Sequence, residues 1–300
     1  MPILVGLLLT ACDSNNNDAP DPDNDDSSGL LFDGSWTVGW PELGHDGKPY
    51  ESERFIVFSE MSSQASRQSV ANIAEEALDD ILSILGVMYD EFTFLPSYAS
   101  RKIHIMADWN QVAQSGLAYR DGFIMRALDS PRYQSAGYTL ESYRRVLQHE
   151  LTHVTEFLLI GNPARQQAND VWLREGFANY GARHHRIQTV DELDAWQAKN
   201  ANVPGGGNPI GIHVWASFPQ SVIANNTTIE YYGFFELASR YLLDANGNGT
   251  TIDDLKAMYE DLGNGMQLWT SFENRFGMTI SYYEANWWEL MRTYLASSQG

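Results

Sequence analysis

Two histidines, His149 and His153, stand four residues apart in the sequence His-Glu-Leu-Thr-His. Residues four apart lie on one face of an α-helix, so both imidazoles can bind the same metal ion. Glu150, between them, is displaced by about 100° around the helix axis from His149. Its carboxylate would therefore stand beside the ion, where a general base for a metal-bound water is needed.

A catalytic zinc ion needs a third protein ligand and one position open to water. Glu175, which follows His153 by 22 residues, is the best candidate. It belongs to a second expected helix at 171–180, and the interval lets the first helix end and the chain return antiparallel. Asn179, one turn beyond Glu175, could accept a hydrogen bond from a ligand imidazole. The alternative for Glu175 is a solvated helix acid, but its aromatic neighbours indicate a packed helix.

The first helix is expected over 139–160. Thr139 is a suitable N-cap, and Gly161-Asn162-Pro163 is a clear stop signal. The paired histidines and Glu150 fall beside an apolar stripe, where they are costly unless they are hydrogen-bonded or bind a metal. Two hydrogen-bonded histidines without a metal are the alternative. The stripe has helical spacing and consists of Leu147, Leu151, Val154 and Leu158.

These two helices together carry a family resemblance. The first reads His-Glu-Leu-Thr-His, and the second contains Trp-Leu-Arg-Glu-Gly-Phe-Ala-Asn-Tyr at 172–180. Over 139–182 the chain resembles the gluzincin metallopeptidases, in particular their peptidase-MA-like branch. The resemblance implies one Zn²⁺ ion held by His149, His153 and Glu175, with Glu150 as the general base.

The region before the first metal helix is expected to form strands and one helix. This strand–helix–strand–strand order resembles the upper lobe of gluzincins. The helix has apolar residues at helical spacing and ends at Gly86. The expected elements are strand 54–59, helix 63–85, strand 101–106 and strand 122–128.

In gluzincins the last of these strands is an exposed edge, to which a substrate peptide adds by main-chain hydrogen bonds. An ordinary edge strand covered by a loop is the alternative. Related aminopeptidases carry an acidic residue on this edge, whereas this strand offers a methionine and an arginine. This difference favours an endopeptidase. The resemblance places the substrate-binding wall at Phe123, Ile124, Met125, Arg126 and Ala127.

A helix expected over 230–243 resembles the one that closes the gluzincin site, which opens with a tyrosine that stabilises the oxyanion. Tyr232 takes this place in the resemblance, with Tyr231 as the alternate, and a core aromatic is the other interpretation. His213 is a further candidate for this role, although lone histidines are usually structural. The remaining helices expected in the lower lobe are 252–262 and 282–295.

Two further patterns resemble metal sites without supporting one. His184 and His185 would lie about 14 Å beyond Glu175 on a continued helix, so solvated surface histidines are expected. The run Asp-Ala-Asn-Gly-Asn-Gly at 244–249 copies the first half of a calcium loop. Its twelfth position is Leu255 rather than the required glutamate, so a helix-ending turn is expected and calcium is not.

The beginning of the chain, 1–11, is a short apolar segment before Cys12. It resembles a bacterial lipoprotein signal peptide that is cleaved before a lipidated cysteine, and it is too short to span a bilayer. A cytosolic protein with a chance apolar start is the alternative. The segment 12–28 contains six Asp and four Asn and is expected to be a disordered tether. Cys12 is the single cysteine, so no disulfide framework is expected.

Length and charge set the remaining expectations. The 300 residues, 43% of them hydrophobic, suit one domain over 29–300 that has two lobes. The expected fold is α+β and zincin-like, with a small mixed sheet and helices in an upper lobe (about 50–136). A mainly helical lower lobe (137–300) would follow, with the active cleft between the lobes. The formal net charge of −20 argues against nucleic acid as a partner.

The sequence therefore predicts zinc-dependent hydrolysis of peptide bonds by a monomer that is lipid-anchored in the bacterial cell envelope. Peptide or protein is the expected substrate, and the lipid anchor is the expected contact with a membrane. A non-catalytic surface lipoprotein that binds peptide or glycan in a zinc-containing cleft is the main alternative. A zinc hydrolase acting on another substrate is the second, because the motif specifies how water is activated and not which group is attacked.

Overall fold

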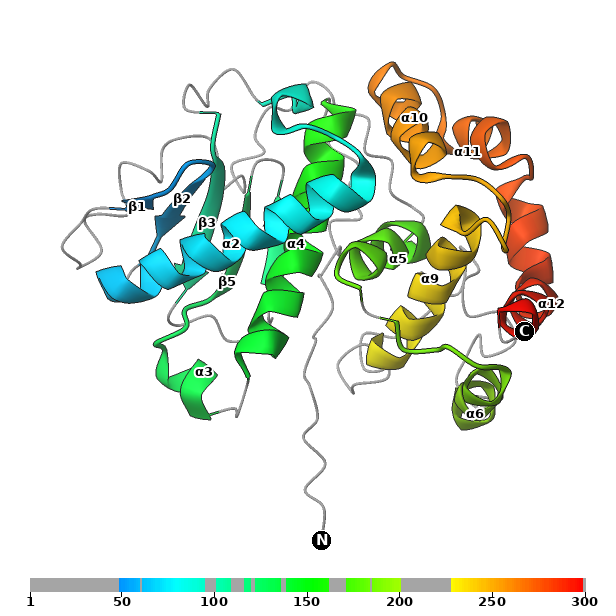
Figure 1. Cartoon of the computed structure of the whole chain (residues 1–300), viewed down its shortest axis with the longest axis horizontal. Coiled ribbons are helices and arrows are strands. Elements are labelled where there is room, and N and C mark those ends of the chain that lie inside the picture. Colours follow the sequence, from blue (N-terminus) through cyan, green and yellow to red (C-terminus); the bar gives the residue numbers. More distant parts are fainter. Residues whose placement is uncertain are drawn as a thin grey trace, which may run out of the picture. The chain divides into compact units, whose positions relative to one another are not determined.

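A computed structural model describes nine segments of the chain and confirms the mixed α+β class (Figure 1). Two compact units are present, Met1–Ser83 with Val87–Ala164 and Ile84–Gly86 with Arg165–Gly300. Cys12, the predicted tether and His213 lie outside the described residues. Each helix in the described segments is too short or too polar to cross a bilayer. These segments are 49–59, 61–94, 101–108, 116–119, 122–135, 139–161, 171–183, 185–200 and 228–298.

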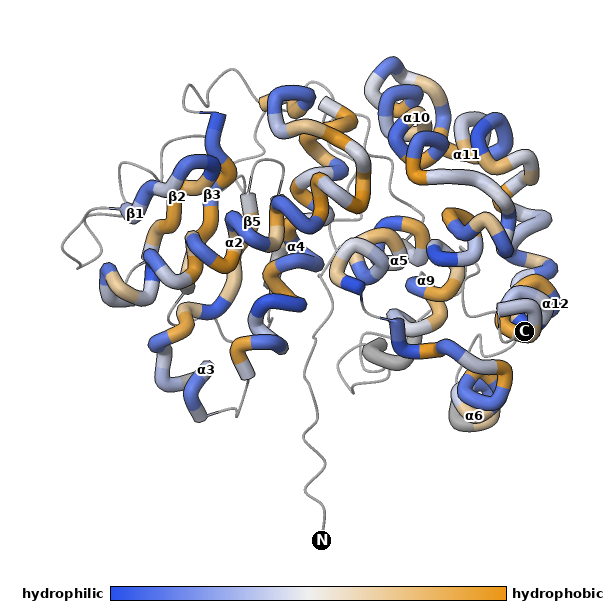
Figure 2. Tube along the Cα trace, viewed as in Figure 1, coloured by the Kyte–Doolittle hydropathy of each residue, from blue (hydrophilic) through white to orange (hydrophobic). Residues whose placement is uncertain are grey.

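The first unit contains a five-stranded mixed sheet with the order β1-β2-β3-β5-β4. The three central strands β2, β3 and β5 are parallel, and the outer strands β1 and β4 are antiparallel to their neighbours. Central parallel strands are buried on both faces, which agrees with the hydrophobic colouring of β2 and β3 in Figure 2. The strands are β1 (Tyr50–Glu51), β2 (Phe55–Phe58), β3 (Ile103–Asp108), β4 (Gly116–Tyr119) and β5 (Gly122–Arg126).

The prediction that 122–128 forms an exposed edge is wrong. β5 pairs with β3 on one side and with β4 on the other, so Phe123, Ile124 and Met125 have strand neighbours on both sides. Arg126 pairs with Asp108, and Ala127 follows the strand as a fully buried residue. A peptide therefore cannot add to β5 as a new strand.

The two-residue strand β1 was not predicted, and neither was β4. Its four residues, Gly-Leu-Ala-Tyr, are too few to show a period-2 pattern. The register pairs Tyr119 with Gly122, which leaves two connecting residues between the strands. Gly122 is itself a paired strand residue, so the Asp-Gly pair at 121–122 is not the two-residue loop that such dipeptides favour, and the sequence gives no clear signal for β4.

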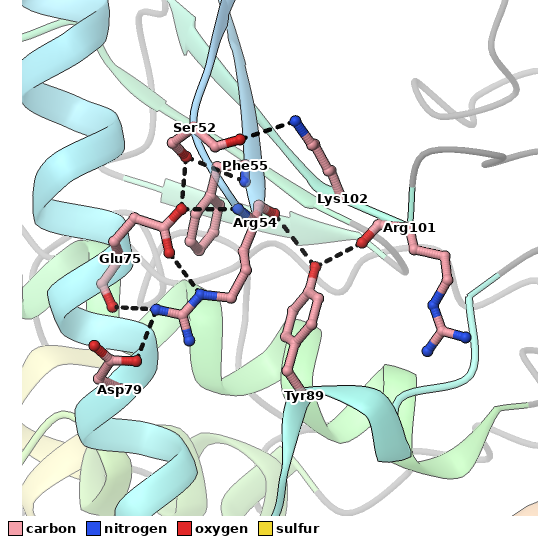
Figure 3. Close-up of polar contacts among 8 residues, drawn as sticks. All are labelled: Ser52, Arg54, Phe55, Glu75, Asp79, Tyr89, Arg101 and Lys102. Carbon is pink, nitrogen blue, oxygen red and sulfur yellow. Dashed lines mark hydrogen bonds and ion pairs between the residues drawn. The ribbon is translucent and has the colours of Figure 1, made fainter.

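Helix α2 (Gln64–Leu85) agrees with the predicted helix and ends where Gly86 adopts a φ of 61°. Arg54, just before β2, binds this helix through two carboxylates (Figure 3). Its Nε donates to Glu75 Oε2 over 2.6 Å, and its Nη2 lies 2.7 Å from Asp79 Oδ1. The Tyr89 hydroxyl donates to the carbonyl oxygen of Arg101 over 2.7 Å. The Arg54 bonds tie α2 to the amino end of β2, and the Tyr89 bond ties the segment after α2 to the residues just before β3.

Helix α4 (Leu140–Ile160) matches the predicted helix at both ends. The Thr139 side chain accepts a hydrogen bond from the Ser142 N–H, and Gly161 ends the helix with a φ of 69°. The predicted apolar stripe is buried, and α4 packs against β4 and β5. Arg144 connects α4 to α2, with Nη1 2.9 Å from Glu76 Oε2. The helix is therefore held at its ends and along its length.

The regular elements of the second unit, within the residues that the structure describes, are all helices. The predicted helices 171–180, 230–243, 252–262 and 282–295 are confirmed to within a few residues at each end. Helices α6 and α11 were not predicted. The elements are α5 (Val171–Gly181), α6 (Val190–Asn200), α9 (Thr228–Leu243), α10 (Ile252–Gly263), α11 (Leu268–Phe276) and α12 (Ile280–Ser297).

Helix α5 packs closely against α9 (Figure 1). A Cβ added at Gly176 would lie 2.3 Å from the main-chain oxygen of Phe235 and 2.3 Å from Ser239 Oγ. Only a glycine permits this approach. The amino-terminal end of α5 is held by Trp172, whose Nε1 donates to Glu284 Oε1 on α12 over 3.1 Å.

Candidate metal centre

The two histidines of the motif lie side by side on α4. The ring centroids of His149 and His153 are 4.8 Å apart, and the ring planes meet at 88°. His153 is buried and His149 is half-buried. The helical spacing thus brings two imidazoles together, as predicted.

Glu150 is also buried on α4. The nearby threonines are engaged with their own helix, because Thr152 Oγ1 donates to the Gln148 carbonyl over 2.8 Å and Thr155 Oγ1 donates to the Leu151 carbonyl over 2.9 Å. The hydroxyl protons of both threonines are therefore used within the helix itself.

Glu175 lies in the middle of α5 and is 1% exposed, so the predicted alternative of a solvated acid is wrong. Arg174 Nη2 donates to its Oε1 over 3.4 Å. Asn179 Nδ2 donates to the carbonyl oxygen of Glu175 over 2.9 Å. Asn179 was predicted to accept a hydrogen bond from a ligand imidazole, whereas its described bond braces the helical turn that carries Glu175.

His149, His153 and Glu175 form a group that could hold a metal ion. Each residue offers one ligand atom, and these atoms all lie within 4.8 Å of one another. Two imidazole nitrogens and one carboxylate oxygen are a donor set that suits zinc and several other divalent transition metals. Within the described segments this is the one such group of three or more His, Cys, Asp or Glu residues.

Tyr232 lies on α9 and is buried, with its ring centroid 5.9 Å from that of Phe235. This aromatic contact agrees with the alternative interpretation of Tyr232 as a core residue and leaves its role at the oxyanion a prediction. The side chain of Tyr231 lies outside the described residues, as does His213.

The predicted helix-ending turn after α9 is confirmed, and the side chains of the calcium-like pattern are used to form it. Asp244 Oδ1 accepts from the Asn246 N–H over 2.8 Å, and its Oδ2 accepts from the Tyr294 hydroxyl over 2.7 Å. Asn248 Nδ2 donates to the Phe276 carbonyl over 2.9 Å. Burial and the neighbouring Asp244 together raise the pKa of Tyr294.

His185 differs from the predicted solvated surface histidine. Its side chain is 38% exposed, and its Nδ1 lies 2.7 Å from Oε1 of the fully buried Glu236. Arg240 Nε lies 3.1 Å from the same carboxylate oxygen. The acid in the apolar sequence of α9 was the available signal, because a buried carboxylate requires cationic or hydrogen-bonding partners. His184 lies outside the described residues.

Comparisons with known proteins leave the site to be interpreted from its own chemistry. No protein-family model matches the chain, and no curated protein matches it.

Proposed function

We propose that this protein is a zincin-like metallopeptidase of the gluzincin type that cuts peptide bonds with a metal-activated water. The proposal depends on the group formed by His149, His153 and Glu175, whose ligand atoms are close enough to serve one ion. Glu150 supports the proposal, because a purely structural zinc site has no need for an additional acid beside its ligands.

His149, His153 and Glu175 would hold the zinc ion through three ligand atoms, and a catalytic zinc with three protein ligands also binds a water. When bound, zinc would lower the pKa of that water to about 7 and polarise the scissile carbonyl. Glu150, which is buried and follows His149 on the same helix, would accept the water's proton and pass it to the leaving amine. Tyr232 is the proposed donor to the oxyanion, with Tyr231 and His213 as the alternates.

The substrate peptide is proposed to add to β4, which replaces β5 in this role. β4 is the outer strand next to β5 and has no second partner among the described strands. Its main chain can bond to an extended peptide. The four residues of β4 contain no acidic side chain that would grip a free amino terminus, so we propose an endopeptidase.

The proposed setting of this activity is the bacterial cell envelope. Lipidation at Cys12 and a tether over 12–28 would anchor a monomeric peptidase domain to the membrane. A peptide or protein is the proposed partner, and the charge of −20 disfavours nucleic acid.

The test combines metal analysis with a peptide-library digest read by mass spectrometry, with and without a zinc chelator. Glu150→Gln should retain zinc and lose a factor of about 10²–10⁴ in turnover, because it removes the general base. His149→Ala and Glu175→Ala should lose the metal. Glu141→Gln is the control, since this exposed acid on α4 pairs with Arg145 and should leave zinc and turnover unchanged.

Two outcomes would contradict the proposed function. Full activity in Glu150→Gln would exclude the mechanism. Zinc binding by the unaltered protein without chelator-sensitive hydrolysis of any peptide would favour a non-catalytic binding protein or a hydrolase with another substrate.

A further inference from the structure

Glu156 lies three residues after His153 on α4, and its carboxylate faces the imidazole. Oε2 of Glu156 is 3.6 Å from Nδ1 of His153. The two side chains are 6% and 3% exposed, so this contact is removed from solvent. Both residues belong to one helix, whose geometry sets their separation.

A carboxylate at this depth is costly unless it faces a partner. The hydroxyl groups of Thr152 and Thr155 are directed to the helix main chain. Position 156 lies about 180° around the helix axis from Leu147, so this acid is not part of the apolar stripe of α4. The imidazole of His153 is one such partner, and the contact gives the acid at position 156 a role at this histidine.

The two ring nitrogens of an imidazole are distinct, and a hydrogen bond at one determines which nitrogen is available to a metal. A carboxylate at Nδ1 keeps the proton on that atom, so Nε2 is the nitrogen presented to an ion. It also fixes the ring orientation and increases the basicity of the ligand. The 3.6 Å contact exceeds hydrogen-bond length by about half an ångström, which a small side-chain rotation would close.

We propose that Glu156 is the positioning residue for His153 in the metal centre. This inference rests on the proposed function, because it assigns Glu156 to the ligand set named there. Glu156 holds the tautomer and the orientation of the imidazole and does not itself touch the ion or the substrate.

The experiment measures zinc affinity by competition with a chromogenic chelator, on the full chain. Glu156→Ala should weaken zinc binding by about 10–100-fold, the usual effect of removing such a partner. Glu156→Gln should retain most of the affinity, because its amide oxygen can still accept a hydrogen bond from Nδ1–H. Glu141→Ala, which truncates an exposed glutamate on the same helix, is the matched control and should bind zinc like the unaltered protein.

Two further measurements separate positioning from a general structural role. The visible spectrum of the cobalt-substituted protein should change in Glu156→Ala and be restored in Glu156→Gln. Thermal unfolding of the metal-free protein should be unchanged or raised in Glu156→Ala, because a buried charge is removed.

Equal zinc affinity in Glu156→Ala and the unaltered protein would overturn the inference and leave the proposed function intact. So would a loss of affinity that is matched by a lower unfolding temperature of the metal-free variant. If the unaltered protein shows no zinc binding that depends on His149, the inference and the proposed function fail together. Zinc binding without hydrolysis would contradict the proposed function alone, since this test measures affinity.

Discussion

Replacing Gly176 with alanine tests whether the close contact of α5 with α9 determines the structure of the second unit. The new Cβ would lie 2.3 Å from the Phe235 carbonyl oxygen and 2.3 Å from Ser239 Oγ. Ordinary contact begins at 3.4 Å, so the methyl group lacks about 1 Å of space. The serine side chain can rotate away, but the carbonyl oxygen is main chain. Consequently, the two helices must separate.

The expected change in the free energy of unfolding of Gly176→Ala is the sum of two opposing effects. Overpacking of this kind costs about 3 kcal/mol at the upper end of its usual range. Alanine in place of glycine within a helix returns about 1 kcal/mol through helix propensity. The expected net loss in the free energy of unfolding is therefore about 2 kcal/mol. Because Glu175 precedes Gly176, the same shift would displace its carboxylate and weaken zinc binding.

Gly233→Ala is the matched control. Gly233 is also a helical glycine in the second unit, but the nearest atoms to its added Cβ are side-chain atoms at 3.4 Å or more. This variant should be unchanged or stabilised by up to about 1 kcal/mol. Urea unfolding followed by circular dichroism measures both variants. Equal stability of Gly176→Ala and Gly233→Ala would refute the reasoning, because it would mean that the interface has space for a methyl group.

Three further predictions concern stability. Burial lowers the pKa of His104 from 6.5 to about 4. Between these two pH values the unfolded chain binds more protons than the folded chain. The free energy of unfolding should therefore fall by roughly 3 kcal/mol as the pH drops through this window. Urea unfolding at pH 7 and 4 should show this loss in the unaltered protein and a smaller one in His104→Asn. Hydrogen bonds from Arg275 and Ser271 lower the pKa of Asp261 despite its burial. Its contribution to the free energy of unfolding is therefore present above about pH 4 and is lost as the pH falls further. If the free energy of unfolding of Asp261→Asn depends on acid pH in the same way as that of the unaltered protein, this prediction is contradicted. Trp287→Ala, at a position 1% exposed, should cost about 3–5 kcal/mol by urea unfolding, and a loss below about 1 kcal/mol would indicate that the site is loosely packed.

The elements determined by local signals were predicted well. Helix α4 begins after Thr139 and ends before Gly161, as its cap residues indicated. The position of His149 and His153 on one face of the helix follows from helical spacing alone, so predicting it needed no knowledge of the tertiary structure. The same holds for α2, which has a long apolar face and a glycine stop.

The features that depend on distant contacts were predicted less well. The order of the strands is set by pairing across the sheet. The four residues of β4 show no recognisable strand pattern, so β5 was mistaken for the edge strand. The contact of His185 with Glu236 joins residues 51 positions apart. Helical extrapolation from Glu175 could not foresee this contact, because the chain turns after Gly181 and Arg183 adopts a φ of 53°.

The two histidines of the motif lie in the middle of α4, and this position affects how they would bind an ion. His149 is the tenth of 21 residues, so it lies more than two turns from either end, beyond the part of a helix that frays. The spacing of the two imidazole-bearing backbone positions is thus established when the chain folds. For these two histidines an arriving ion would have to order only the side-chain rotamers, which reduces the conformational entropy that they lose on binding it.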